Sequence, residues 1–138
     1  MFQRPFYLNQ LIQFKDSDFI KVITGVRRSG KSVLLMLYRE YLLKENISEN
    51  HIIYMNFESY DYQTITTEEK FREKLNTLLP NDNKKIYLLF DEIQVVEGWQ
   101  RVVNGIRVSF DSDIIITGSN AKMLSGELAT LLSGRYIE

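Results

Sequence analysis

Residues 25–32 read Gly25-Val26-Arg27-Arg28-Ser29-Gly30-Lys31-Ser32, and this stretch decides the fold. It matches the pattern G-x-x-x-x-G-K-[ST] in full. The β-branched run Ile20–Thr24 precedes it, and an apolar helical pattern from roughly Lys31 to Glu45 follows it. A glycine-containing turn between a strand and a helix is typical of a phosphate-binding loop, because its N–H groups and the electropositive helix end can face phosphate oxygens.

Each residue type in this loop, the Walker A motif, fits a phosphate ligand. Gly25 and Gly30 permit backbone conformations in which a side chain would clash. Lys31 is expected to reach the β- and γ-phosphates, and the Ser32 hydroxyl to bind Mg²⁺. The predicted nucleotide-contacting residues are Gly25, Val26, Arg27, Arg28, Ser29, Gly30, Lys31, Ser32 and Val33. The alternative is a chance match in a glycine-containing turn.

Composition limits the class of protein. The chain has 138 residues, 44% of them hydrophobic, and no cysteine, which predicts one globular domain over residues 1–138 without disulfides. The net charge of −1 disfavours a domain whose main ligand is nucleic acid. No secretory signal and no membrane-spanning apolar run is evident, so a soluble, cytoplasmic domain is expected.

Strands and helices are expected to alternate along the chain. Most of the expected strands are apolar on both faces, which predicts an α/β fold with a parallel sheet covered by helices on each side. The strand aromatics Tyr54 and Phe57 are interpreted as ordinary strand residues, and Trp99 as a core residue. The strands are expected at 20–24, 51–57, 86–90, 114–117 and 135–138, and the helices at about 31–45, from Thr66 or Thr67 to Leu79, 97–110 and 121–133.

Asp91 and Glu92 directly follow the apolar strand Ile86–Phe90. The carboxyl ends of parallel strands meet at the edge of the sheet where the phosphate loop also opens. Asp91 is therefore expected to hold Mg²⁺ and Glu92 to activate the water that attacks the γ-phosphate, as a Walker B motif. The alternative is an acidic pair that ends a strand at solvent.

Another polar stretch, Thr117-Gly118-Ser119-Asn120, follows the next strand. A polar side chain here would lie beside the Asp91 strand and could hydrogen-bond the γ-phosphate or the attacking water. Asn120 is favoured for this sensing role, with Ser119 second. Both residue types are also good helix N-caps, so a purely structural role stays open.

These residues together resemble the AAA+ ATPases, and within them a bacterial and archaeal group whose members usually continue into a C-terminal domain of unknown function. The resemblance rests on the order of residues 25–32, Leu88-Leu89-Phe90-Asp91-Glu92-Ile93-Gln94, Trp99, Thr117-Gly118-Ser119 and Leu132-Ser133-Gly134-Arg135. It implies a three-layer core with strand order 5-1-4-3-2 and ATP as the nucleotide. The family's small helical lid is absent, which suggests a core truncated at its C-terminal end.

The resemblance also suggests a role for Arg135. In AAA+ proteins an arginine near this point often enters the nucleotide site of a neighbouring subunit, so Arg135 implies a possible homo-oligomer. The alternative is a surface arginine near a helix C-terminus, where it favours the helix dipole. Neither a protein partner nor contact with nucleic acid or a membrane is indicated.

The sequence thus predicts an ATPase that binds ATP with Mg²⁺ and couples hydrolysis to conformational change, with Glu92, Lys31, Asn120, Ser119 and Arg135 as catalytic residues and Ser32 and Asp91 as metal ligands. One competing class is a slow-hydrolysing, nucleotide-dependent regulatory switch that exposes or hides an interaction surface. Another is a phosphotransferase that acts on a small molecule.

Overall fold

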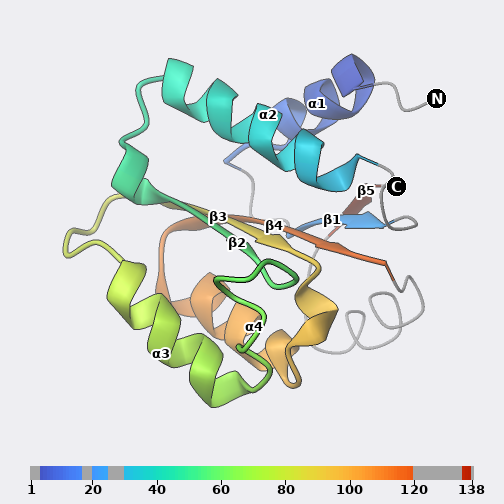
Figure 1. Cartoon of the computed structure of the whole chain (residues 1–138). Helices are drawn as coiled ribbons and strands as arrows, with labels where there is room; N and C mark the ends of the chain where they lie inside the picture. Colours follow the sequence, from blue (N-terminus) through green and yellow to red (C-terminus); the bar gives the residue numbers. More distant parts are fainter. Residues whose placement is uncertain (1–3, 17–19, 25–29, 120–134, 138) are drawn as a thin grey trace.

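The computed structural model describes residues 4–16, 20–24, 30–119 and 135–137. They form a parallel sheet of five strands in the order β2-β3-β4-β1-β5, with helices on both faces (Figure 1). The expected α/β class, the three layers and the strand order are confirmed. The elements are α1 (Arg4–Gln13), β1 (Lys21–Thr24), α2 (Lys31–Lys44), η1 (Glu49–His51), β2 (Ile52–Asn56), α3 (Glu68–Leu78), β3 (Ile86–Asp91), η2 (Ile93–Val95), α4 (Trp99–Ser109), β4 (Ser112–Gly118) and β5 (Arg135–Ile137).

Successive side chains of each strand point to opposite faces of the sheet, and this divides the core into two apolar layers. Leu88 and Phe90 of β3 pack toward α3 and α4, whereas Tyr87 and Leu89 of the same strand pack toward α1 and α2. All residues of β3 are buried, as expected for a central strand covered on both faces. Trp99 is 1% exposed in the layer with α3 and α4, which confirms its expected place in the core.

The helix boundaries have local causes. Thr67, one of the two expected caps of α3, accepts a hydrogen bond from the Lys70 amide at 3.3 Å and so satisfies an N–H of the first turn. α4 begins at Trp99 instead of the expected Glu97, because Gly98 adopts a left-handed conformation (φ 78°) just before the helix. The expected helix over residues 121–133 lies outside the described residues.

The sequence interpretation contained no helix before β1, yet α1 is present and packs on α2. Leu8, Leu11 and Ile12 share one face at helical spacing, and Leu11 is fully buried in the layer that α2 also covers. The pattern is short and lies in a polar segment, so it gives a weak signal in the sequence.

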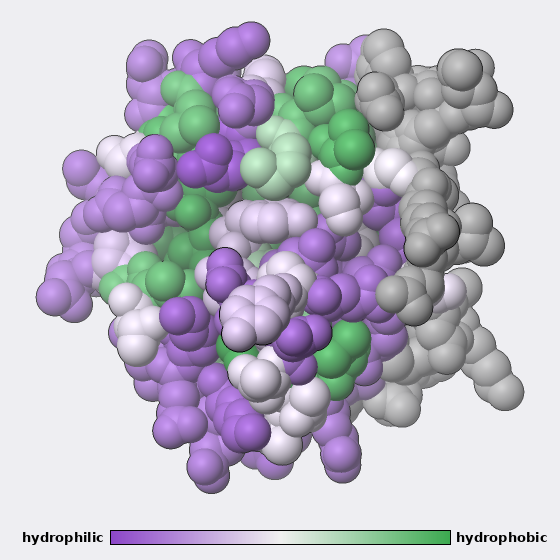
Figure 2. Space-filling model, viewed as in Figure 1, coloured by the Kyte–Doolittle hydropathy of each residue, from purple (hydrophilic) through white to green (hydrophobic). Residues whose placement is uncertain are grey.

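The face of the molecule in Figure 2 is mostly polar, as expected when the apolar side chains are packed inside. The apolar areas on this face are separate patches. Of the helices that the structure describes, none combines the length and the apolar character needed to cross a membrane.

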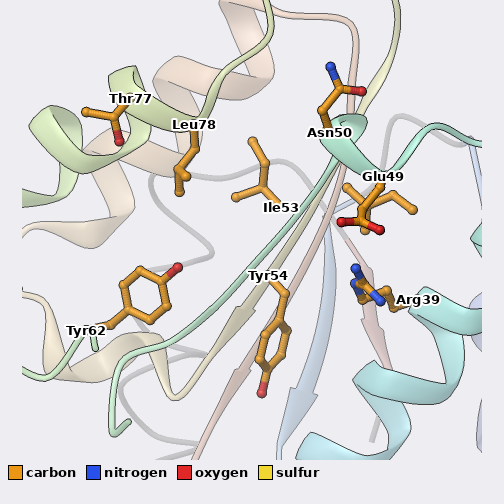
Figure 3. A pocket seen from close by; sticks show the side chains of 9 residues that line it. Arg39, Glu49, Asn50, Ile53, Tyr54, Tyr62, Thr77 and Leu78 are labelled. Carbon is orange, nitrogen blue, oxygen red and sulfur yellow. The ribbon is translucent and has the colours of Figure 1, made fainter. Parts of the chain in front are cut away.

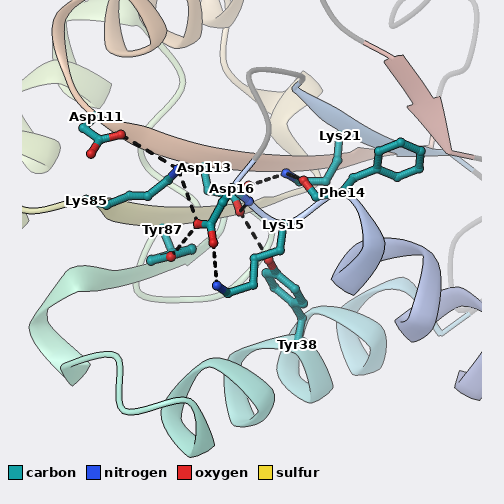
Figure 4. A network of polar contacts seen from close by, with 9 residues as sticks. All are labelled: Phe14, Lys15, Asp16, Lys21, Tyr38, Lys85, Tyr87, Asp111 and Asp113. Atoms are coloured by element: carbon teal, nitrogen blue, oxygen red, sulfur yellow. Dashed lines mark hydrogen bonds and ion pairs between the residues drawn. The ribbon is translucent and has the colours of Figure 1, made fainter.

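A buried polar network joins the amino ends of the strands (Figure 4). Lys21 at the start of β1 forms an ion pair with Asp113 of β4, and both side chains are at most 1% exposed. Asp113 also accepts hydrogen bonds from the Tyr38 hydroxyl of α2 at 3.3 Å and from the Asp16 amide at 2.9 Å. Burial lowers the pKa of Lys21, and the attraction of Asp113 opposes that shift. This ion pair connects β1, β4, α2 and the segment before β1.

We expect Asp113→Asn to lower the free energy of unfolding by about 3 kcal/mol, because it leaves the buried Lys21 ammonium without its counter-ion. Asp111→Asn is the matched control, since Asp111 is 66% exposed and pairs with Lys85 at 3.8 Å. The control should change stability by less than about 0.5 kcal/mol. Urea unfolding followed by circular dichroism measures both, and equal stabilities of the two variants would contradict the role of the ion pair.

Asp16 gives a pH-dependent prediction. Burial alone would raise its pKa, but hydrogen bonds from Lys15 and Tyr87 and the charges of Lys15 and Lys85 outweigh it and lower the pKa to about 2. Because the folded-state pKa lies below the unfolded value, the stabilising effect is complete above the unfolded pKa and is lost as the pH falls toward 2. The stability difference between the wild type and Asp16→Asn should therefore shrink between about pH 4 and pH 2. Thermal unfolding across this range tests it, and a difference independent of pH would refute it.

Candidate functional site

Lys31 lies where α2 begins, at the carboxyl end of β1. Gly30 precedes the helix in a left-handed conformation (φ 92°), which glycine adopts without steric cost. The Lys31 side chain is 4% exposed, and its Nζ lies 3.1 Å from Glu92 Oε2 and 3.2 Å from Ser119 Oγ. The helix start thus meets the residues that follow β3 and β4.

Asp91, the last residue of β3, is a buried carboxylate held by hydroxyl groups. The Ser32 hydroxyl donates to Oδ2, and the Tyr54 hydroxyl donates to the same oxygen at 2.9 Å. Thr117 of β4 donates to Oδ1 at 2.6 Å. Burial and the charge of Asp91 raise the pKa of Tyr54, so its phenol stays protonated and acts as a donor.

Glu92 has an unusual backbone and a side chain with three polar partners. Its φ of 55° and ψ of 51° are left-handed, and its amide donates to Thr117 Oγ1 at 2.9 Å. Gln94 and Ser119 each donate to Oε1 at 2.8 Å. Burial alone would raise the pKa of Glu92, but these hydrogen bonds and Lys31 outweigh it and lower the pKa. The carboxylate is therefore ionised at neutral pH and can accept a proton or a hydrogen bond.

The oxygen atoms of Asp91 and Ser32 suit a magnesium ion as ligands. A carboxylate oxygen and the Ser32 hydroxyl are in direct hydrogen-bond contact, and both are hard oxygen ligands of the kind Mg²⁺ prefers. Magnesium sites beside phosphates usually use one or two protein oxygens and leave the other positions to water and the phosphates. Ser32 and Asp91 are thus suited to hold this ion.

Of the predicted site residues that the structure describes, five come together. Lys31, Glu92 and Ser119 contact one another, Ser32 contacts Asp91, and Thr117 joins the two groups into one polar cluster at the carboxyl ends of the strands. Gly30 and Val33 lie at the start of α2, next to this cluster in sequence. Gly25, Val26, Arg27, Arg28, Ser29 and Asn120 lie outside the described residues.

Arg135 is placed by its backbone alone. It opens β5 and is in register with Lys21, the first residue of β1, whereas the polar cluster lies beyond the other end of β1. Arg135 is thus at the amino edge of the sheet. A role in the site of a neighbouring subunit stays a prediction.

The sequence interpretation missed three side chains of the cluster. Tyr54 is not an ordinary strand aromatic, because its hydroxyl bonds the metal-site candidate Asp91. Thr117 belongs to the predicted polar stretch, but a role was predicted only for Ser119 and Asn120. Thr117 hydrogen-bonds both Asp91 and Glu92. Gln94, which bonds Glu92, carries no signal beyond its nearness in sequence. The alternation of β2 places Tyr54 on the face of α2, which was the available signal for that residue.

Comparison with known proteins agrees with this geometry. The model of a family described as AAA domain matches residues 17–138. This chain belongs to the AAA domain family. The resemblance inferred from the motifs is thereby confirmed, and the chain carries an AAA-type P-loop ATPase domain that binds nucleotide.

Two curated proteins similar to this AAA domain come from a bacterium and an archaeon. An uncharacterized protein of Haemophilus influenzae is 62% identical over 138 residues, which is all of this chain and 34% of that protein. Uncharacterized protein MJ1544 of Methanocaldococcus jannaschii is 40% identical over 119 residues, covering 86% of this chain and 25% of that protein. The matched part thus covers 34% and 25% of the length of these two relatives.

A solved structure shares the fold. The structure of C. elegans PCH-2 aligns with a TM-score of 0.56 and 15% sequence identity, covering 95% of this chain and 40% of that one. At this identity the likeness concerns the fold of the AAA domain alone.

Thr117 should be important for stability as well as for the site. Thr117→Val keeps the shape but leaves a buried Asp91 oxygen and the Glu92 amide without their partner, so we expect a loss of about 2 kcal/mol. Thr117→Ser, which retains the hydroxyl, should lose less than half as much. Urea unfolding measures both variants, and equal losses would show that the methyl group, rather than the hydroxyl, is responsible.

Proposed function

We propose that this AAA domain binds ATP with Mg²⁺ and hydrolyses it, and that the cycle drives a conformational change. The observation that carries the proposal is the convergence of Lys31, Ser32, Asp91, Glu92 and Ser119 on one point at the carboxyl ends of the sheet. A cation, an ionised carboxylate and metal-binding oxygens in one place are what phosphoryl transfer to water requires.

The contacts support a division of labour among these residues. Lys31 offers a buried ammonium, which would hold the β- and γ-phosphate oxygens. Glu92 would orient the attacking water and accept its proton. Ser119 lies within hydrogen-bond distance of both Lys31 and Glu92, so its hydroxyl would respond to the presence of the γ-phosphate.

Ser32 and Asp91 would hold the magnesium ion. When bound, Mg²⁺ neutralises charge that develops on the phosphate oxygens during transfer. The chain would determine where the ion lies. Thr117 and Tyr54 hold the two oxygens of Asp91 by hydrogen bonds, and Ser32 is held in place by helix α2.

The remaining predicted site residues are also given roles in this proposal. Residues 25–29 would surround the phosphates with backbone N–H groups, and Asn120 would share the sensing role with Ser119. Arg135, whose backbone lies at the amino edge of the sheet and away from the polar cluster, would act in the site of a second copy in a homo-oligomer.

A slow-hydrolysing nucleotide switch is the second candidate, and the contacts of Glu92 favour it. Both carboxylate oxygens are engaged, by Gln94, Ser119 and Lys31. A water molecule would share these oxygens with Gln94, Ser119 and Lys31, which would weaken Glu92 as a base and slow hydrolysis.

Glu92→Gln in the full-length protein tests the catalytic proposal. We expect ATP binding to change by less than about threefold and the acceptor-free release of phosphate to fall by about 10²-fold or more, because the amide cannot accept the proton of water. Glu97→Gln, at an exposed position after η2, is the matched control and should behave as the wild type. Isothermal titration calorimetry and a phosphate-release assay supply the two readouts.

Three outcomes separate the candidate functions. Binding without measurable hydrolysis in wild type and variant alike would favour the switch. Phosphate transfer that needs an added acceptor would favour a phosphotransferase. Failure of the wild-type protein to bind ATP would reject the proposal as a whole.

A further inference from the structure

We infer that Tyr54 is a positioning residue for the metal site: its hydroxyl fixes the orientation of the Asp91 carboxylate that faces Ser32. This inference rests on the proposed use of Mg²⁺ and ATP. It assigns a role to a side chain of the edge strand β2 that no sequence motif marks.

The position of Tyr54 follows from the register of the sheet. Tyr54 pairs with Leu89, and Asn56 pairs with Asp91, so Tyr54 lies two residues short of the acidic residue on the neighbouring strand. Its ring extends toward the carboxyl ends of the strands (Figure 3), and the hydroxyl donates to Asp91 Oδ2 at 2.9 Å. A shorter side chain at this place would not reach the carboxylate.

The ring is held by its surroundings. It packs against the apolar layer that includes Leu34 and Leu35 of α2. It also forms part of the wall of a groove along β2, together with Arg39 and Glu49 (Figure 3). A rigid ring has few rotamers, so the hydroxyl is presented to Asp91 from a fixed point.

The two oxygens of Asp91 are held from opposite sides. Thr117 on β4 donates to Oδ1, and Tyr54 on β2 donates to Oδ2, while β3 with Asp91 lies between these strands. The rotation of the carboxylate is thereby restricted. Oδ2, the oxygen held by Tyr54, is also the one that contacts Ser32, so Tyr54 acts on the atom nearest the second ligand.

Groups that orient a metal ligand through hydrogen bonds typically change metal affinity about 10- to 100-fold when they are removed. Tyr54 should therefore affect the part of nucleotide binding that depends on Mg²⁺. It should affect binding of the nucleotide alone much less, because its hydroxyl interacts with Asp91 and Ser32, the two proposed metal ligands.

The test compares Tyr54→Phe with the wild type in the full-length protein, by calorimetry with a non-hydrolysable ATP analogue in Mg²⁺ and in EDTA. Phe keeps the ring and removes only the hydroxyl. We expect the affinity gained from Mg²⁺ to fall about tenfold, and the affinity in EDTA to change less than about twofold. Tyr87→Phe is the matched control, because it removes a tyrosine hydroxyl that donates to a carboxylate, Asp16 at 2.7 Å, at the opposite end of the sheet. It should leave both affinities unchanged.

The outcomes distinguish this inference from the proposed function. A Tyr54→Phe variant that keeps the full Mg²⁺ effect overturns the positioning role and leaves the proposed function intact. An equal loss in Mg²⁺ and in EDTA shows a merely structural role and also overturns the inference. If the wild type binds no nucleotide, or gains nothing from Mg²⁺, the proposed function fails and the inference fails with it.

Discussion

The structure of the site depends on one constraint, the burial of the Asp91 carboxylate. Its side chain has no exposed surface, and a buried charge is costly unless hydrogen bonds replace the lost water. The replacement comes from hydroxyl groups on α2, β2 and β4, which are Ser32, Tyr54 and Thr117. Satisfying this one side chain therefore joins the helix that follows the phosphate loop to the three strands β2, β3 and β4. The requirement for polar partners fixes the relative position of the elements that make up the site.

The two ends of the sheet use buried charge differently. At the amino end, Lys21 and Asp113 pair with each other, and Tyr38 and the Asp16 amide complete the partners of Asp113. That network joins elements of the fold. At the carboxyl end, Lys31 and Glu92 lie at the start of a helix and after a strand, where a ligand can take over their contacts. Between the two networks the strands are apolar on both faces, so a change at one end does not place charge in the core. The sheet thus separates the Lys21–Asp113 ion pair from the Lys31–Glu92 pair of the candidate site.

The sequence allowed the fold and much of the site to be predicted, because both depend on local patterns. The apolar runs gave the strands, and Lys31, Ser32, Asp91 and Glu92 were found because parallel strands bring residues after their carboxyl ends to one edge. Tyr54 and Thr117 were missed for another reason. Their hydroxyls act across strand neighbours, and which residue faces Asp91 depends on a register that one sequence does not contain. Helix α1 was missed because its apolar face is short, although Leu11 is fully buried there.

Glu92 adopts a left-handed backbone conformation that glutamate normally avoids, and its contacts in the candidate site account for this. A non-glycine residue in the left-handed region costs about 1 kcal/mol, and glycine or asparagine would adopt it more readily. The conformation turns the chain sharply after β3, and it brings the carboxylate to Lys31 and Ser119 while the amide reaches Thr117. An extended Glu92 would continue the direction of the strand, and its side chain could not keep all of these contacts. The strained backbone thus places a carboxylate that contacts Gln94, Ser119 and Lys31 at the edge of the candidate site.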